Sequence, residues 1–421
     1  MTTNRRSFLT GVGAVGASAY VSKFGIRRAR AQQPIRIGGQ GALSGAHADY
    51  GRQMRMGATL AIEEINEAGG ILGRTVELNF VDEELRPDVA VRNARQQVTD
   101  WGADFLVGVD SSGSSLAVGP VLAELDRICI FTHAATHRLT EELCYDQKIR
   151  QIFRASVPVY QDAILAARMF AEREDLVRWA NIGADYEYGR ASWAMFKHTL
   201  SQLRPDVEFV AETWAPFQTL DFSGHVSSVM AAEPNGLFST PWAGEAVSLL
   251  RTGLVMGAFD QLGAWWQAMG ASVDVLEANA GHLDQFQDKL WATGRYIFNW
   301  SEEATRERND RFVADFQERW GRFPNYSAEC TYAAVYSIKQ ACETAGSTET
   351  AEVIEALEGA TIETPAGMRT YREEDHQAVY TVPGGRVVKL DEYPIPVVGA
   401  DLSIISPKEY YRWPPFEPIS Y

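Results

Sequence analysis

The sequence predicts an α/β protein built from two doubly wound lobes, and three observations lead to that fold class. The chain has 421 residues, more than a single hydrophobic core normally organises. Short apolar strands alternate with amphipathic helices, which is the pattern of a parallel sheet with helices on both faces. The alternation begins again with a helical stretch near residue 161, so we expect a second unit of the same kind.

The first 31 residues have the pattern of an export signal. A twin-arginine motif, Asn4-Arg5-Arg6-Ser7-Phe8-Leu9, precedes a weakly apolar stretch at 9–21, and Ala29-Arg30-Ala31 supplies a small-x-small cleavage site. The apolar stretch is shorter than the run of about 20 residues that spans a bilayer. We therefore expect export by the twin-arginine route to the periplasm, cleavage after about Ala31, and no membrane anchor.

The charge excludes nucleic acid as a partner. Removing the six basic residues of the leader from the 39 Lys and Arg leaves 33 against 55 acidic residues, a net charge of about −22. An acidic field of this size repels nucleic acid and anionic membranes.

The first unit begins with a strand at Ile35–Gly38, and its apolar runs and turn residues predict the other elements. Its helices are expected from about Gly51 to Gly69-Gly70 and from Pro87 onward. The further strands are expected at 76–81, 105–107 and 128–131.

The second unit and the end of the chain follow the same logic. Helices are expected at 161–173, 188–203, 222–232, 306–320 and 329–345, and strands at 177–182, 207–213 and 236–239. Residues 366–421 are rich in strand and turn signals, with Pro383-Gly384-Gly385 as a predicted hairpin turn.

The stretch "IRIGGQGALSG" at 35–45 is close to a dinucleotide-binding turn but departs from it. Ser44 stands where the third glycine should be, and Glu63 and Glu64, about 20 residues on, fall inside a helix and not at a strand end. A phosphate cradle is therefore rejected. The loop still lies at the carboxyl end of a strand, as do the hydroxyl-rich loops 108–115 and 132–136, and doubly wound folds bind ligands at such ends.

No catalytic or metal motif is found. The four cysteines have no C-x-x-C spacing, and Cys144, in a polar loop, is the expected disulfide partner while Cys129 is expected to be buried. His47, His133 and His137 have no acid or cysteine at ligand spacing. There is neither a G-x-S-x-G elbow nor an H-E-x-x-H helix, so we expect no cofactor, no metal and no enzymatic activity.

Several segments together resemble one family. They are Gly41-Ala42-Leu43-Ser44-Gly45, Tyr50-Gly51, "AIEEINEAGGILGR" (61–74), "THAATHRLT" (132–140), "YGR" (188–190) and "TYAAVYSIKQA" (331–341). On these segments the chain resembles the type I periplasmic solute-binding proteins of ABC importers, in particular the branched-chain amino-acid binding proteins.

The resemblance implies two Rossmann-like lobes, joined by crossover hinge strands, that close on a ligand like a hinged trap. It places lobe one at 32–155 plus 300–365 and lobe two at 156–299 plus 366–421. The ligand-binding residues that it implies are a carboxylate clamp and a set of aromatic side chains: Ser111, Ser112, Ala134 and Thr136 for the clamp, and Tyr50, Tyr188, Trp242 and Tyr326 for the rings.

One departure from the family concerns the acid that pairs with a bound amino group. Its position falls at about Trp266, with Asp260 as the one acid within several residues of it, and Glu329 is the only other acid that the sequence could bring to the cleft. Because a buried unpaired ammonium costs several kcal/mol, we expect a small carboxylate with an apolar or aromatic body, such as a keto or aromatic acid. A hydrophobic amino acid is the next choice.

The expected partners are this carboxylate and the membrane permease of an importer. Two alternatives are a ligand-presenting protein for a receptor kinase and an amide- or urea-binding protein of the same fold.

Overall fold

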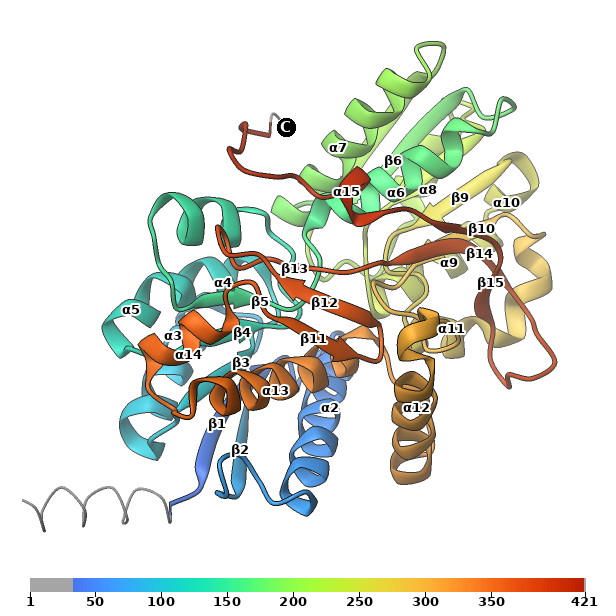
Figure 1. Ribbon diagram of the computed structural model, residues 1–421. Helices are drawn as coiled ribbons and strands as arrows, with labels where there is room; N and C mark the ends of the chain where they lie inside the picture. Colours follow the sequence, from blue (N-terminus) through green and yellow to red (C-terminus); the bar gives the residue numbers. More distant parts are fainter. Residues whose placement is uncertain (1–32, 420–421) are drawn as a thin grey trace, which may run out of the picture.

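The computed structural model describes residues 33–419, so the predicted export signal lies outside the described residues. The chain forms two α/β lobes and a small third sheet (Figure 1). No helix among residues 33–419 has the length and apolarity needed to cross a membrane.

The first lobe is built on a parallel five-stranded sheet with the order β2-β1-β3-β4-β5. This is a doubly wound order. Its strands are β1 (Ile35–Gly41), β2 (Val76–Asp82), β3 (Phe105–Gly108), β4 (Cys129–Phe131) and β5 (Ile152–Arg154). Its helices are α2 (Ala48–Glu67), α3 (Pro87–Gln96), η1 (Gln97–Trp101), α4 (Ser112–Val118), η2 (Gly119–Val121), α5 (Leu122–Leu125) and η3 (Leu139–Asp146).

The glycines of β1 belong to the strand and not to the turn that the sequence predicted. A Cβ on Gly39 would lie 2.4 Å from the ring of Phe80, and one on Gly38 would lie 2.0 Å from the Gln97 amide oxygen. Both faces of β1 are therefore covered closely by neighbouring side chains, and glycine is required for that approach.

The second lobe is built on a seven-stranded sheet with the order β15-β14-β10-β9-β8-β6-β7. Five strands are parallel: β6 (Arg178–Ala184), β7 (Glu208–Ala215), β8 (Gly236–Ser239), β9 (Ala264–Gln267) and β10 (Leu290–Thr293). Two are antiparallel: β14 (Pro383–Val388) and β15 (Val397–Ile404). The helices are α6 (Val159–Ala171), α7 (Glu187–Leu203), α8 (Ser223–Met230), α9 (Gly244–Val255), α10 (Ala258–Gln261), α11 (Val273–Asn279) and η4 (Ala280–Phe286).

Pro383-Gly384-Gly385 opens strand β14 and is not a hairpin turn, which corrects the sequence prediction. Gly384 and Gly385 pair with Thr293 and Ala292 of β10. Proline is tolerated there because it is the first residue of the strand.

The remaining elements return to the first lobe. They are η5 (Glu303–Thr305), α12 (Arg306–Trp320), α13 (Tyr326–Ala345), α14 (Thr350–Leu357), β11 (Thr361–Thr364), β12 (Gly367–Tyr371) and β13 (Ala378–Val379). The final helix α15 (Pro407–Tyr410) packs on α6 of the second lobe. Helix α13 lies along α2 (Figure 1). The small sheet has the order β11-β12-β13, and Gln377 bridges Arg154 of β5.

The boundary between lobe one and lobe two that the sequence predicted at residues 365 and 366 therefore falls inside the β11–β12 hairpin. Because β12 and β13 pair with β11 and not with the second sheet, we place the last crossing between the lobes at about 380–382. The earlier crossings lie after β5 and after β10, as the order of the strands in the two sheets requires.

Candidate functional site

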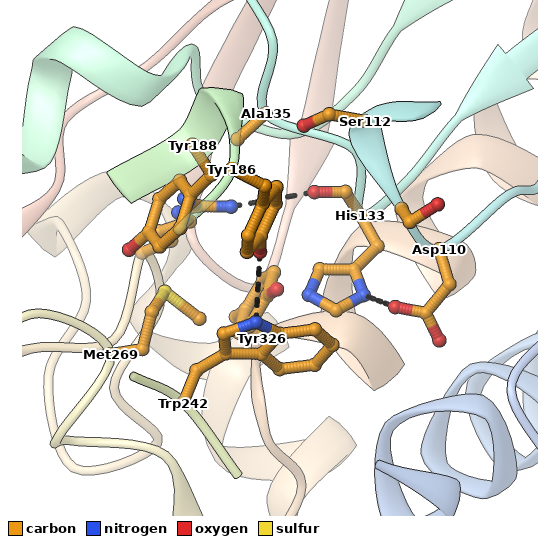
Figure 2. A pocket seen from close by; sticks show the side chains of 11 residues that line it. Asp110, Ser112, His133, Ala135, Tyr186, Tyr188, Trp242, Met269 and Tyr326 are labelled. Atoms are coloured by element: carbon orange, nitrogen blue, oxygen red, sulfur yellow. Dashed lines mark hydrogen bonds and ion pairs between the residues drawn. The ribbon is translucent and has the colours of Figure 1, made fainter. Parts of the chain in front are cut away.

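A pocket lies between the two lobes, at the carboxyl ends of the parallel strands of both sheets (Figure 2). Its cavity volume in this structure is about 20 Å³, so the side chains of the two lobes nearly fill it. The first lobe contributes residues that follow β3 and β4: Asp110, Ser111, Ser112, His133 and Ala135. The second lobe contributes residues that follow β6, β8, β9 and β10: Tyr186, Tyr188, Trp242, Met269 and Arg295. Tyr326, the first residue of α13, completes the lining.

Arg295 is the cation of the pocket, and sequence reasoning missed it. Its side chain is buried, and Nε and Nη2 donate to Oδ2 of Asp162 at 3.1 and 2.9 Å, while Nη1 donates to the His133 carbonyl at 3.4 Å. Burial alone lowers the pKa of a guanidinium, but the Asp162 carboxylate raises the pKa of Arg295 above its ordinary value, so it stays charged. Its bonds to Asp162 and His133 use three of its five N–H groups, and the guanidinium also lies against Tyr188, whose hydroxyl is a further partner.

His133 carries the second polar group of the pocket. Its Nδ1 is paired with the buried carboxylate of Asp110, whose other oxygen accepts from the Ala42 backbone N–H at 3.0 Å. Below this pair, Glu83 accepts from the backbone N–H groups of Asp110 and Ser111 at 3.0 and 3.3 Å. Burial first, and then the charge of Asp110, raise the pKa of the Glu83 carboxyl.

Aromatic rings form the rest of the wall. Tyr50 lies behind the lining and stacks on His133, with ring centroids 4.9 Å apart and planes at 7°. Trp242 meets Tyr50 and His133 edge-on, both at 5.1 Å, and its Nε1 donates to the Tyr186 hydroxyl at 2.9 Å. Each buried ring of this kind removes roughly 150–250 Å² from water, so the wall can hold an apolar ligand body strongly.

The predicted hydroxyl clamp is only partly present at the pocket. Ser112 lines it, and Ser111 lines it while also capping α4, because its Oγ accepts from the Ser114 N–H at 3.1 Å. Ala134 and Thr136 do not line it. The Ala134 carbonyl accepts from Ser156, and the Thr136 hydroxyl donates to Glu187 across the two lobes while its carbonyl accepts from Arg154.

Trp266 lies in the core of the second lobe, which corrects its predicted place in the cleft. It belongs to β9, is fully buried, and packs edge-on against Phe170 of α6 at 6.0 Å. The strand ends at Gln267, and the residue that reaches the pocket from this strand end is Met269. Glu329 also lies outside the lining, because it is paired with Arg369 at 2.7 Å.

Of the four predicted aromatic residues, three lie at the pocket, and Tyr50 lies behind its lining. Tyr188, Trp242 and Tyr326 line the pocket. The four cysteines are all free and buried, so the disulfide expected for Cys144 is not present. Cys144 lies in η3, within the core behind the first sheet, and not in a polar loop. Among residues 33–419 there is no cluster of His, Cys, Asp and Glu that could hold a metal ion.

The missed residues share a position that a sequence could reveal in part. Arg295 and Met269 each follow a strand end by two residues and Ala135 follows one by four, the place where doubly wound folds bind ligands. The sequence could not indicate that Arg295 forms a buried ion pair with Asp162, because Asp162 lies 133 residues earlier in the chain.

Comparison with known proteins defines the class to which this fold and pocket belong. The periplasmic binding protein family matches residues 34–391, so the chain belongs to that family. It is a type I member related to the branched-chain amino-acid binding proteins, and thus a solute-binding protein of the kind that ABC transporters use.

Two curated relatives are of similar length. The Leu/Ile/Val-binding protein BraC3 of Rhizobium johnstonii is 28% identical over 349 residues, covering 82% of this chain and 89% of the relative. The leucine-, isoleucine-, valine-, threonine- and alanine-binding protein of Pseudomonas aeruginosa is 27% identical and covers 82% and 87%.

Solved structures share the fold. A solute-binding protein of an ABC transporter from Rhodopseudomonas palustris BisB5, in complex with 3,4-dihydroxybenzoic acid, has a TM-score of 0.75 and 20% identity, covering 87% of this chain and 96% of that one. A second R. palustris protein, in complex with 4-hydroxybenzoate, has a TM-score of 0.76 and 20% identity, covering 89% and 97%.

Proposed function

We propose that this chain is the exported solute-binding component of an ABC importer, and that it captures a small carboxylate with an aromatic or apolar body. The observation that carries the proposal is Arg295, a buried guanidinium that lines a pocket walled by aromatic rings. A charge-assisted hydrogen bond contributes about 1.5–3 kcal/mol, and micromolar affinity needs only about 8 kcal/mol. The bound ligand would then pass to a membrane permease in the periplasm.

The acids of the pocket argue against a ligand with an amino group. Asp110 is committed to His133 and to the Ala42 N–H, and Asp162 is committed to Arg295. Asp110 is the one carboxylate among the described lining residues, so an ammonium placed here would have to compete with His133 for it. The aromatic acids bound by the two R. palustris proteins of the same fold are consistent with this class of ligand.

A hydrophobic amino acid is the second candidate. It is favoured by the named ligands of the curated relatives, leucine, isoleucine and valine, and by the presence of Asp110 in the lining. For this candidate to hold, the ammonium would have to displace His133 from Asp110.

A thermal-shift screen of the purified chain tests the proposal. The panel contains benzoate, 4-hydroxybenzoate, phenylpyruvate, 4-methyl-2-oxopentanoate, leucine, valine and benzamide. A ligand at 100 times its dissociation constant adds about 2.7 kcal/mol, which corresponds to roughly 3 °C for a chain of this size. We expect shifts with the amine-free carboxylates and none with benzamide, because the neutral amide lacks the charge that Arg295 recognises.

The screen separates the candidates. Shifts confined to leucine and valine would replace the carboxylate proposal with the amino-acid one. A shift with benzamide equal to that with benzoate would remove the role of Arg295 as an anion-binding group.

A further inference from the structure

Residues 406–417 form a segment that contacts both lobes, and we call this segment the strap. It begins in the second lobe, where α15 packs on α6 (Figure 1). Arg168 of α6 forms an ion pair with the Glu409 carboxylate at 3.2 Å, and the same guanidinium donates to the Glu409 carbonyl at 3.4 Å. The first end of the strap is therefore attached to the second lobe.

The other end of the strap is attached to the first lobe. Arg412 forms an ion pair with Glu141 of η3 at 3.0 Å, and the Arg412 carbonyl accepts from Arg372, which follows β12, at 2.5 Å. Phe416 meets Tyr145 of η3 edge-on, with ring centroids 5.3 Å apart. Because Glu141 and Arg372 are buried, these contacts are screened less than those of an exposed ion pair.

Between its two ends, the strap contacts the last crossing between the lobes through Tyr410. The side chain of Tyr410 is buried, and its hydroxyl donates to the Tyr380 carbonyl at 2.8 Å and accepts from the Val382 N–H at 3.1 Å. One hydroxyl thus holds the backbone on both sides of Thr381. Hinge residues change φ and ψ when two lobes rotate, so a rotation about this crossing disturbs both hydrogen bonds.

The lobes are closed in this structure. His47 of the first lobe is buried against Trp242 and Glu245 of the second lobe, with a ring distance of 4.1 Å to Trp242 and 3.9 Å between His47 Nε2 and the Glu245 carboxylate. The pocket between the lobes is nearly filled by side chains. The contacts of the strap with both lobes and with the crossing are therefore contacts of the closed arrangement.

We infer that the strap is a conformational device that holds the two lobes closed before a ligand binds. It joins the lobes by a path separate from the three covalent crossings, and through Tyr410 it also fixes the last of these crossings. An open chain has to give up the Tyr410 hydrogen bonds, the Arg412–Glu141 ion pair or both, so the strap lowers the open fraction. This inference is independent of which solute the pocket binds.

The reaction of a thiol placed in the pocket measures the opening of the lobes. Ser112→Cys puts this thiol in the lining, where Ser112 is buried and the cavity is too small to admit N-ethylmaleimide. The reagent reaches position 112 only in open chains, so the rate of its reaction there follows the open fraction. The four native cysteines are free and buried in the cores of the chain, and they report global unfolding in the same sample.

Two substitutions in the Ser112→Cys chain weaken the strap at different points. Tyr410→Phe keeps the ring and removes the hydroxyl at the crossing, and Arg412→Gln removes the ion pair with Glu141. We expect each to raise the reaction rate at position 112 by about threefold or more, since each removes a contact that opening breaks. The rates of the native cysteines should not change.

The matched control is Lys408→Gln. Lys408 is an exposed residue of the strap, and its substitution removes one positive charge, as Arg412→Gln does, so we expect a rate at position 112 within about 1.5-fold of that with the intact strap. Equal rates with the intact strap and with both weakened straps would overturn the inference.

A rate increase shared by the native cysteines would overturn it as well, because the strap would then stabilise folding and not the closed arrangement. Small-angle X-ray scattering of the ligand-free, unmodified chain gives an independent check. We expect the profile calculated from the closed lobes, and the profile of an open chain would contradict the role of the strap.

Discussion

The proposed role of Arg295 couples ligand binding to folding, because the guanidinium that lines the pocket also neutralises the buried carboxylate of Asp162. Removing one member of a buried ion pair leaves an uncompensated charge, which typically costs about 3–5 kcal/mol. A loss of binding in a single Arg295 variant would therefore be ambiguous. The pair has to be changed together before the two roles can be separated.

The variant Arg295→Met should lose about 3–5 kcal/mol of unfolding free energy and should bind carboxylates at least about tenfold more weakly, since one charge-assisted hydrogen bond is lost. In the double variant Arg295→Met/Asp162→Asn the buried charge is gone, so we expect at least half of the stability to return. Binding should not return. Urea unfolding and calorimetric titration measure the two effects, and a double variant with wild-type affinity would contradict the assignment of Arg295.

At the scale of elements, the contact between α2 and α13 fixes the place of Tyr326. A Cβ added to Gly57 of α2 would lie 2.0 Å from the Ala328 carbonyl oxygen, two residues into α13 from Tyr326. The side chain of Asn325 caps the same end of α13 by accepting from the N–H groups of Ser327 and Ala328 at 3.0 and 3.2 Å. The first turn of α13 is thus held from two sides.

Gly57→Ala tests this contact. Alanine is the better helix former by up to about 1 kcal/mol, but the methyl group collides with backbone, so we expect a net loss of about 1–3 kcal/mol in urea unfolding. The control is Gly224→Ala in α8, where a Cβ meets nothing within 4 Å and stability should stay equal or rise slightly. Equal effects at both glycines would show that α13 can move away without cost.

Sequence patterns predicted elements well where the periodicity was local. The strand Gly236–Ser239 and the helix Arg306–Trp320 have the predicted bounds. The glycines of β1 and β14 were misassigned because glycine is also required where another side chain covers a strand, as Phe80 covers Gly39. That requirement depends on contacts with residues distant in the chain.

The site was predictable at the level of loops but not of every side chain. The loop after the strand at 105–107 pointed to Ser112, and the family resemblance pointed to Tyr188 and Trp242; all three line the pocket. Trp266 was placed there by counting along the chain, and the end of β9 at Gln267 shows why the count failed. Arg295 has no local pattern that distinguishes it from a surface arginine.

At the scale of the whole molecule, polar contacts hold the lobes together around the pocket. Thr136 of the first lobe donates to Glu187 of the second, and Arg322 joins Asp49 to Glu277 of α11 at 2.6 and 2.9 Å. His47 lies 3.9 Å from Glu245 and stacks on Phe217 at 5.0 Å. Several of these groups are buried and titratable, so the stability of the folded chain depends on pH.

The direction of that dependence follows from the shifted groups. Burial raises the pKa values of Glu141 and Glu245 to about 7 from 4.5. Between those values the folded state binds more protons than the unfolded state, so these acids lower the unfolding free energy as pH rises from about 4.5 to beyond 7. Burial lowers the pKa of His47 to about 4 and that of His137 to about 3, which stabilises the folded state as pH rises toward 6.5 and adds nothing further above it.

The shifted acids therefore set the dependence above pH 6.5. We expect the unfolding free energy to fall between pH 6.5 and 8 by roughly 1 kcal/mol for each of Glu141 and Glu245, and to fall further through Glu83, whose pKa burial raises to about 8. Urea unfolding at pH 6.5, 7.25 and 8 measures the slope. Glu245→Gln should reduce this fall in unfolding free energy by roughly 1 kcal/mol, since glutamine has no proton to lose. The control Glu318→Gln, on the exposed face of α12, should leave the slope unchanged. A stability that rises over this interval, or a Glu245→Gln slope equal to that of the unmodified chain, would mean that the cleft around Glu245 admits water and that the lobes are less tightly closed than their contacts indicate.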